Sequence, residues 1–475
     1  MSRVPILVIL GSTGTGKSRL SIELAQKFSG EIISADSMQV YRGLDIITAK
    51  VTEEERLLAP HHMLDFVDPL HNYCVLDFQK KALPIISDIV AKRKMPIIVG
   101  GTNYYIESLL WQVLVEDPDA SGNSIQTHDG LVLENYNVKC EQMTETMQKG
   151  KITVSATTEF ELNRKLEEEK LVTSKKMKYD DNEQSNEDLH LKLTQVDPEM
   201  ARRLHPNNRR KIIRSLEVFE THGAKHSEIL RHQQVAGGSG LGGPLRFPNS
   251  LILWLKCDQE ILDKRLDQRV DTMLEAGLVE ELLGFHERYN QERINMNASP
   301  DYTKGIFQSI GFKEFHNYLI LPETERNSDK GKILFQQGVF DLKLVTRRYA
   351  RRQQRWILNR FIKRIDRQVP PIYELDCTNI QEWGSKVLEP AIKIINAKLK
   401  DEIPAQKSLN GTSQDKNLTD SNNQESHWCE TCKKILIGEL QWKSHRNGAK
   451  HRKMENKKKK IMAHHLTDNK ISLVC

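Results

Sequence analysis

The stretch that most constrains the fold is Gly11-Ser12-Thr13-Gly14-Thr15-Gly16-Lys17-Ser18, near the start of the chain. It follows the apolar run Val4–Leu10 and precedes a helical pattern that begins at Ser18. A strand, a Gly-x4-Gly-Lys-Ser loop and a helix in this order are typical of a phosphate-binding loop. Backbone N–H groups and the helix N-terminus would face the anion, with Lys17 at the outer phosphates and Ser18 on a Mg²⁺ ion. An ordinary glycine-rich turn is the alternative.

The residues around this loop alternate between strand and helix patterns. This order predicts an α/β fold, a P-loop NTPase-like parallel sheet with flanking helices. Functional residues in such sheets collect where strands end, which draws attention to the polar segments 34–41 and 100–105. The expected strands are 5–10, 31–34, 96–99 and 250–256, and the expected helices are 18–28, 75–92, 104–114 and a helix that Asn207 or Asn208 could cap.

Composition changes along the chain and suggests its domains. Only 38% of the residues are hydrophobic, and a long stretch after residue 115 is polar with weak periodicity. We expect that stretch to be an insertion, partly helical and partly disordered. The predicted parts are the first part of a P-loop catalytic core (1–115), the insertion (116–195), the second part of the core with a C-terminal helical region (196–400), a linker (401–427), a zinc finger (428–455) and a basic tail (456–475).

Residues 341–367 read as a long basic helix, with ten cationic side chains against two acidic ones. A solvated face on a packing helix is one interpretation. The excess of positive charge favours the other, a surface for a polyanion such as nucleic acid. The cations include Arg347, Arg348, Arg351, Arg352 and Arg355.

A metal site is predicted near the end of the chain. Cys429 and Cys432 are followed, after twelve residues, by His445 and, after five more, by His451. This spacing suits one tetrahedral Zn²⁺. The lysines and arginines after His451 suggest nucleic-acid contact or a nuclear signal, and a single finger would add affinity more than specificity.

The remaining features bound the environment of the protein. Seven scattered cysteines argue against a disulfide framework and for a reducing compartment. No run approaches the ~20 apolar residues of a membrane span, so we expect no membrane partner. The first strand starts too early for a signal or transit peptide. We expect a cytoplasmic protein, with a nuclear location left open.

Six segments, in this order, resemble the tRNA dimethylallyltransferases, also called tRNA isopentenyltransferases, and the finger resembles their eukaryotic form. The resemblance covers roughly residues 4–400, apart from the insertion, which is polar where the family has a helical domain. Mitochondrial members exist in the family, but no presequence is visible here. The segments are Gly11–Ser18, Ser34–Tyr41, Val99–Tyr105, His205–Phe219, Arg269–Leu274 and Gln308–Glu314.

The resemblance implies transfer of a dimethylallyl group from its diphosphate to the exocyclic N6 amine of the adenosine 3′-adjacent to the anticodon. It implies that Asp36 is the general base, although binding of Mg²⁺ is the ordinary role of an acid at this place. Thr13 would contact the leaving-group oxygen, or be a mere spacer in the loop. Arg214 or its neighbour Arg210 would bind the diphosphate from the opposite wall.

The resemblance also implies the acceptor site. The adenine must leave its stack to reach the electrophile, which is easier in a single-stranded loop such as the anticodon loop. We expect catalytic Mg²⁺, structural Zn²⁺ and a monomer. The residues expected to bind tRNA are Asp36, Ser37, Met38, Gln39, Thr102, Gln308, Ser309 and Ile310, together with Arg347, Arg348, Arg351, Arg352 and Arg355 on the basic helix.

Two other functions remain open at this point. A P-loop small-molecule or nucleoside kinase with an RNA-binding tail would use the Gly11–Ser18 loop but would need neither the basic helix nor the finger. An RNA-binding protein with a vestigial P-loop would carry no catalytic role at Asp36.

Overall fold

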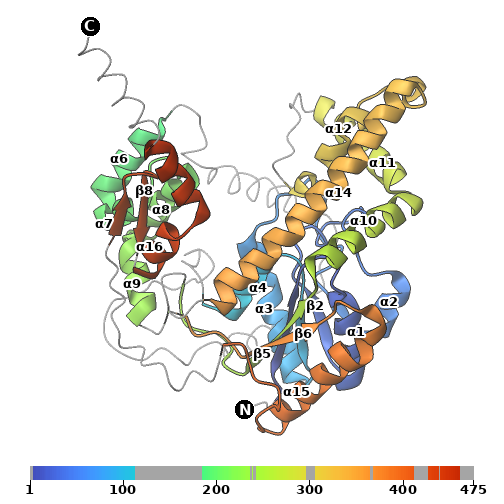
Figure 1. The fold of residues 1–475 in the computed structure, drawn as a ribbon, viewed down its shortest axis with the longest axis horizontal. Coiled ribbons are helices and arrows are strands. Elements are labelled where there is room, and N and C mark those ends of the chain that lie inside the picture. The colour runs from blue at the N-terminus through green and yellow to red at the C-terminus, as the bar shows by residue number, and fades with distance from the viewer. Residues whose placement is uncertain are drawn as a thin grey trace, which may run out of the picture. The chain divides into compact units, whose positions relative to one another are not determined.

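The computed structural model describes residues 4–112, 184–235, 238, 242–295, 305–363, 367–410, 426–437 and 439–459 (Figure 1). Two compact units divide the chain. The first comprises Met1–Leu114 with His232–Ser421, and the second comprises Val115–Arg231 with Asn422–Cys475. Most of the predicted insertion, residues 116–183, lies outside the described residues.

A six-stranded sheet, parallel throughout, forms the centre of the first unit. Its strand order is β3-β2-β4-β1-β5-β6, so the loops after β1, β2 and β4 emerge side by side at one edge. The predicted strands 31–34, 96–99 and 250–256 are confirmed, and the first strand is shifted by one residue; β3 and β6 were not predicted. The strands are β1 (Ile6–Gly11), β2 (Glu31–Ser34), β3 (His61–His62), β4 (Pro96–Val99), β5 (Ser250–Lys256) and β6 (Ile372–Asp376).

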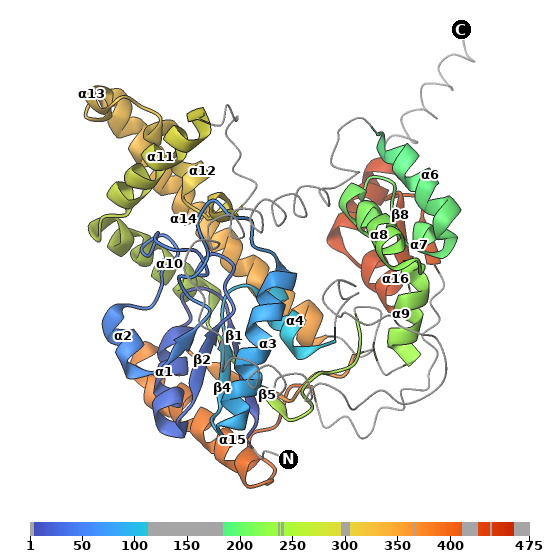
Figure 2. The same cartoon turned by 180° about the vertical axis from the view of Figure 1, so that it is seen from behind.

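Helices cover both faces of this sheet (Figures 1 and 2). Alternate residues of β1 serve the two layers, because strand side chains point to opposite faces. Leu7 and Ile9 pack with α1 and α15, whereas Ile6, Val8 and Leu10 pack with α3 and α4. These helices are α1 (Lys17–Phe28), α3 (Val75–Ala91), α4 (Asn103–Leu110) and α15 (Glu389–Leu399).

A long helix, α14 (Asp329–Ile357), begins well before the predicted residue 341. The hydroxyl of Ser328 caps it by accepting the Gly331 N–H, and a π-helical turn at Leu358–Ile362 continues it. A third apolar core joins α10, α11, α12 and α14 to the loop after β2. The remaining helices of this unit are α2 (Glu53–Leu58), α10 (Gln259–Glu275), α11 (Leu278–Asn295), α12 (Phe312–Leu319) and α13 (Glu323–Arg326).

The cations in the second half of α14, from Lys343 onward, divide into two groups. One group faces α10 and forms a ladder of ion pairs with its acids, Lys343 with Asp271, Arg347 with Asp267 and Arg351 with Asp263. The other group, Arg348, Arg352 and Arg355, is exposed to solvent. Only part of the basic pattern is therefore available to a polyanion.

The chain leaves the first unit and returns to it at neighbouring points. The Gln112 N–H donates to the Pro244 carbonyl over 2.9 Å, and the Gly243 N–H donates to the Gln112 carbonyl over 2.6 Å. Trp111 and Leu245 form an antiparallel bridge beside them. A Cβ at Gly243 would lie 2.3 Å from the Gln112 carbonyl oxygen, which explains a glycine there.

Helices and a small hairpin make up the second unit. Asp197 caps α7 and also accepts the N–H and hydroxyl of Ser227, while Asn208 occupies the N-cap position of α8 without a side-chain capping bond. Within the described residues, no helix is long and apolar enough to cross a membrane. The elements are α6 (Asn186–Val196), α7 (Pro198–Arg203), α8 (Arg209–His222), α9 (His226–Val235), β7 (Ser426–Cys429), β8 (Lys434–Ile437), α16 (Glu439–Arg446) and a helix over residues 449–459.

A buried carboxylate anchors α14 and the segment after it to α4. Glu107 is only 2% exposed. It accepts the Trp356 indole N–H over 2.7 Å, the Arg360 guanidinium over 2.8 and 3.0 Å, and the Arg367 guanidinium over 3.4 Å. The guanidinium of Arg367 also lies 3.4 Å above the Trp111 ring. These arginines of the basic segment therefore hold the fold together.

We predict that Glu107→Gln lowers the free energy of unfolding by about 3–5 kcal/mol, because it leaves buried arginines without their counter-charge. Urea denaturation followed by circular dichroism measures the change. Asp88→Asn is the matched control, since Asp88 pairs with Lys92 at the surface and its loss is expected to cost less than about 1 kcal/mol. Equal effects of the two substitutions would contradict the prediction.

Candidate active site

The loop Gly11–Ser18 joins β1 to α1 and is held by α14. The Ser12 hydroxyl donates to the Ala350 carbonyl over 3.0 Å, and the Thr13 N–H donates to Gln353 Oε1 over 2.8 Å. Within the loop, the Thr15 hydroxyl and the Lys17 ammonium both donate to the Ser12 carbonyl over 2.8 Å. These hydrogen bonds fix the conformation of the first half of the loop.

Two glycines of the loop adopt the left-handed conformation that L side chains avoid, with φ +81° at Gly14 and φ +85° at Gly16. A Cβ at Gly14 would lie 2.8 Å from Leu266 on α10, and one at Gly16 would lie 2.8 Å from Trp383. The Trp383 indole is fixed in turn by donating to Glu23 over 2.8 Å. The pattern of glycines in the sequence therefore reflects both backbone conformation and close packing.

Two cations, Lys17 and Arg269, line the cavity. Burial, together with the positive charge of Arg269, lowers the pKa of Lys17 from 10.5 to about 8, and the Asp36 carboxylate only partly offsets these effects. Burial also lowers the pKa of the Arg269 guanidinium, again partly offset by Asp36. Desolvated cations gathered in one place favour an anionic ligand.

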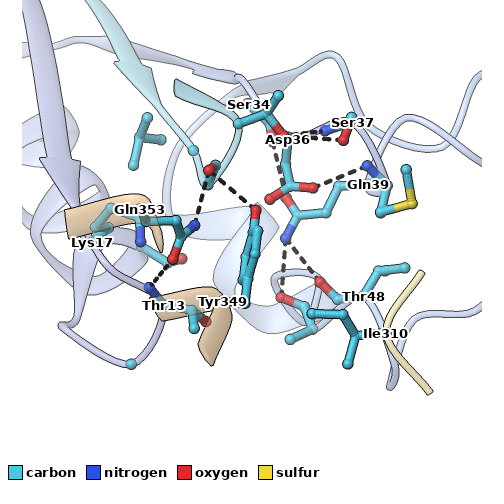
Figure 3. A pocket seen from close by; sticks show the side chains of 18 of the residues that line it. Thr13, Lys17, Ser34, Asp36, Ser37, Gln39, Thr48, Ile310, Tyr349 and Gln353 are labelled. Carbon is cyan, nitrogen blue, oxygen red and sulfur yellow. Dashed lines mark hydrogen bonds between the residues drawn. The ribbon is translucent and has the colours of Figure 1, made fainter. Parts of the chain in front are cut away.

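Asp36 follows β2 and lies opposite the loop (Figure 3). One of its oxygens, Oδ1, accepts the Met38 N–H over 3.0 Å. Beside it, the Thr102 hydroxyl accepts the Ser37 N–H over 2.9 Å and donates to the Ser37 hydroxyl over 3.1 Å. Hydrogen bonds therefore fix the segment that carries the carboxylate to the segment after β4.

Gln39 tightens the other side of this segment. Its amide oxygen accepts the Ser34 hydroxyl over 2.9 Å, and its amide nitrogen donates to the carbonyls of Thr48 and Ala49 over 3.2 Å. These bonds engage the amide of Gln39 with the protein itself. A role of Gln39 in contacting a base stays a prediction.

One cavity of about 690 Å³ collects most of the predicted site. A volume of this size is typical of a ligand site. Five residues of the loop expected to hold the diphosphate thus line the same space as the residues expected to surround the adenine. The other three loop residues, Gly11, Ser12 and Thr15, are buried and are not part of the lining. The predicted residues that line the cavity are Thr13, Gly14, Gly16, Lys17, Ser18, Asp36, Ser37, Met38, Gln39, Thr102, Gln308, Ser309, Ile310 and Arg352.

Other predicted site residues lie elsewhere. Arg347 and Arg351 are paired with Asp267 and Asp263 on α10, while Arg348 and Arg355 are exposed beyond the cavity lining. Arg210 and Arg214 lie on α8, in the second unit, and Arg214 is 3.6 Å from Glu217. Their role at the diphosphate stays a prediction.

The lining residues that were not predicted include Arg269 on α10, and Tyr349 and Gln353 on α14. A signal for Arg269 existed, because helical periodicity places it beside the buried residues Leu266 and Val270. Burial and the Asp36 carboxylate raise the pKa of the Tyr349 hydroxyl well above its usual value, so this group remains a proton donor. No sequence pattern pointed to Tyr349 or Gln353 as cavity residues, because both lie within an arginine-rich segment.

The predicted metal centre forms within the second unit. The ligand atoms of Cys429, Cys432, His445 and His451 lie within 4.8 Å of one another. His451 Nδ1 lies 3.4 Å from both sulfurs and 3.1 Å from His445 Nε2. Bonds of about 2.0–2.3 Å to a tetrahedral Zn²⁺ bring ligand atoms to about this separation. The four residues therefore fit a structural zinc ion.

Comparisons with known proteins agree with this geometry. The IPP transferase family model matches residues 39–166 and 149–360, an isopentenyl transferase model matches residues 4–60, and a C2H2-type zinc-finger model matches residues 427–451. The chain is 45% identical to tRNA dimethylallyltransferases of Mus musculus and of Homo sapiens, in each case over 96% of this chain and 87% of the relative.

A solved structure is also similar. The structure of a eukaryotic dimethylallyltransferase acting on tRNA matches with a TM-score of 0.66 and 29% sequence identity, covering 98% of this chain and 100% of that one. The P-loop sheet, the cavity at its edge and the zinc-finger ligands thus occur in a chain whose sequence and fold both match one group of enzymes. The chain belongs to the tRNA dimethylallyltransferase family.

Proposed function

We propose that this protein transfers a dimethylallyl group from dimethylallyl diphosphate to the exocyclic N6 amine of the adenosine 3′-adjacent to the anticodon in tRNA. The observation that carries the proposal is the single cavity with a phosphate-binding loop and two cations on one side and a carboxylate on the other. A diphosphate can bind and depart on the first side. An amine can lose its proton on the second.

The donor side suits a leaving group that gains negative charge. As the carbon–oxygen bond breaks, charge develops on the diphosphate, and donors already aimed at that place stabilise the transition state. Backbone N–H groups of the loop, Lys17 and Arg269 are the donors of this chain. The Thr13 hydroxyl lines the same cavity and supports a role at the leaving oxygen.

The acceptor side suits a weak nucleophile. The lone pair of an adenine amine is delocalised into the ring, so a carboxylate that takes its proton helps the attack, typically by 10²–10⁴-fold. Asp36 is the carboxylate in the cavity, and one of its oxygens already accepts the Met38 N–H. We assign the base role to Asp36.

Magnesium fits the donor side. Ser18, at the start of α1, lines the cavity beside the phosphate-binding loop. Oxygen ligands such as its hydroxyl, completed by diphosphate oxygens and water, are those Mg²⁺ prefers. The ion would neutralise part of the charge on the departing diphosphate.

Two positive surfaces support binding of tRNA. Arg348, Arg352 and Arg355 line one exposed face of α14, and Arg352 reaches the cavity. In the second unit, the helix over residues 449–459 exposes a group of cations beside the zinc ligands. They are Lys450, Arg452, Lys453, Lys457, Lys458 and Lys459.

Transfer of labelled dimethylallyl from its diphosphate into unmodified tRNA, with Mg²⁺ present, tests the function. We expect incorporation by the wild-type protein and a loss of about 10²–10⁴ in rate for Asp36→Ala, with tRNA affinity retained. Labelled ATP in place of the prenyl donor distinguishes a kinase. RNA that stays unlabelled, or full activity of Asp36→Ala, would contradict the proposal.

The pKa of Lys17 predicts how donor binding depends on pH. Below about pH 8 the ammonium is charged in the free protein, and above it binding must first restore the proton, so the affinity for dimethylallyl diphosphate should fall up to tenfold per pH unit. The diphosphate itself is fully ionised there, because phosphate groups titrate near pH 6. Titration calorimetry from pH 6.5 to 9.5 measures it. Lys17→Met should bind dimethylallyl diphosphate weakly, and its affinity should not fall with pH in this way. If the pH dependence persists in Lys17→Met, Lys17 is not its cause.

The finger is expected to serve affinity more than chemistry. Cys429→Ser removes a zinc ligand, and a small zinc-dependent fold is lost without its metal. We predict a larger rise in the dissociation constant for tRNA than fall in the transfer rate of bound tRNA. Gel-shift titration at one fixed salt concentration measures the first, because phosphate contacts depend on salt. Cys74→Ser, at an exposed cysteine in the first unit, is the control. Unchanged affinity would contradict the prediction.

A further inference from the structure

The side chain of Gln353 spans the edge of the sheet between two loops (Figure 3). It is buried, with 4% of its surface exposed. Its amide oxygen accepts the Thr13 N–H over 2.8 Å, and its amide nitrogen donates to the Gly101 carbonyl over 2.9 Å. The first loop follows β1 and the second follows β4, the strand beside it. One amide thus connects the donor side of the cavity to the acceptor side.

We propose that Gln353 is a positioning residue, which fixes the Thr13 segment and the Asp36 carboxylate at the separation that transfer requires. This inference rests on the proposed function. It assigns to Gln353 no contact with either substrate.

On the donor side, the bond fixes the first half of the phosphate-binding loop. Ser12 and Thr13 are consecutive, and both are bonded to α14, through the Ala350 carbonyl and the Gln353 amide. The Thr13 N–H is therefore used by the protein, while the rest of the residue lines the cavity. Removing the amide frees the backbone of Thr13 and with it the direction of the hydroxyl.

On the acceptor side, the Gln353 amide and the Asp36 carboxylate both approach Gly101. A Cβ built on Gly101 would lie 2.8 Å from Asp36 Oδ2 and 2.9 Å from Gln353 Nε2, so both side chains border the same glycine. The Tyr349 hydroxyl donates to the same Gly101 carbonyl over 3.2 Å. The next residue, Thr102, holds the backbone N–H of Ser37. The position of Gly101 is thus linked to that of Asp36.

The chemistry of the amide suits this place. It offers one donor and one acceptor in a rigid plane and carries no charge. A carboxylate at this place would repel the Asp36 carboxylate. A cation would lower the pKa of Asp36 and so make it a weaker base. The main chain of Gln353 is held as well, because the Asn103 amide donates to its carbonyl over 3.4 Å.

Three variants test the inference: Gln353→Met, which removes both bonds, Gln353→Glu, and Gln354→Met as the matched control, since Gln354 is outside the cavity lining. We expect Gln353→Met to lower the single-turnover rate by about 10–100-fold, because a displacement of about 1 Å between reacting groups has such an effect. Dissociation constants for dimethylallyl diphosphate and tRNA should stay within about threefold of wild type. Gln354→Met should leave the rate unchanged.

Gln353→Glu supplies a readout that simple loss of packing would not give. A buried carboxyl beside Asp36 has a raised pKa, and once protonated it can again donate to the Gly101 carbonyl. The rate of this variant relative to wild type should therefore rise as the pH falls from 8 to 6. A flat ratio would overturn the inference, and this variant keeps the test decisive if Gln353→Met does not fold.

A double-mutant cycle with Thr13→Ala closes the argument. If Gln353 acts through Thr13, Gln353→Met should cost clearly less in the Thr13→Ala background than in wild type. Additive losses, or losses in affinity alone, would overturn the inference. If the wild-type protein is active and Gln353→Met has an unchanged rate, the inference about Gln353 is refuted and the proposed function stands. If the wild-type protein transfers nothing, the proposed function is overturned as well.

Discussion

The structure depends on keeping two cations, Lys17 and Arg269, close together and partly out of water. Burial of the ammonium is the main cause that lowers the pKa of Lys17, and the positive charge of Arg269 lowers it further. Asp36 offsets only part of this lowering. A diphosphate beside Lys17 and Arg269 would supply the negative charge that both cations favour. Loss of the diphosphate as a leaving group uses the same stabilisation, with more charge to receive it.

Helix α14 holds the phosphate-binding loop in place. Its inner face carries Tyr349 and Gln353 to the cavity, one of its sides pairs with the acids of α10, and its end is tied to the buried Glu107. The sequence of this helix suggests a basic surface, but many of its residues contact other elements of the fold. Its exposed arginines, Arg348, Arg352 and Arg355, are the ones left available to a polyanion.

The strands that were predicted correctly are short, apolar and bounded by turn residues, and the glycine loop carried its own structural context. β3 has only two residues and β6 alternates polar with apolar residues after two prolines, so neither resembles a buried central strand. The cavity residues that follow strands were predicted because parallel sheets place their sites there. Arg347 and Arg351 were expected on RNA, but their partners on α10 lie about 80 residues away in sequence, a distance no local pattern spans. The dual bonds of Gln353 depend on tertiary structure in the same way.

The closure at Gln112 and Gly243 has a consequence for how such a chain can change. The backbone at Gln112, before the insertion, is hydrogen-bonded to the backbone at residues 243–244, after it. The position of the sheet therefore does not depend on the segment inserted between them. Segments of different length and composition can be exchanged at this point while the catalytic edge keeps its geometry. The inserted part can therefore diverge in sequence without disturbing the hydrogen bonds between Gln112 and residues 243–244.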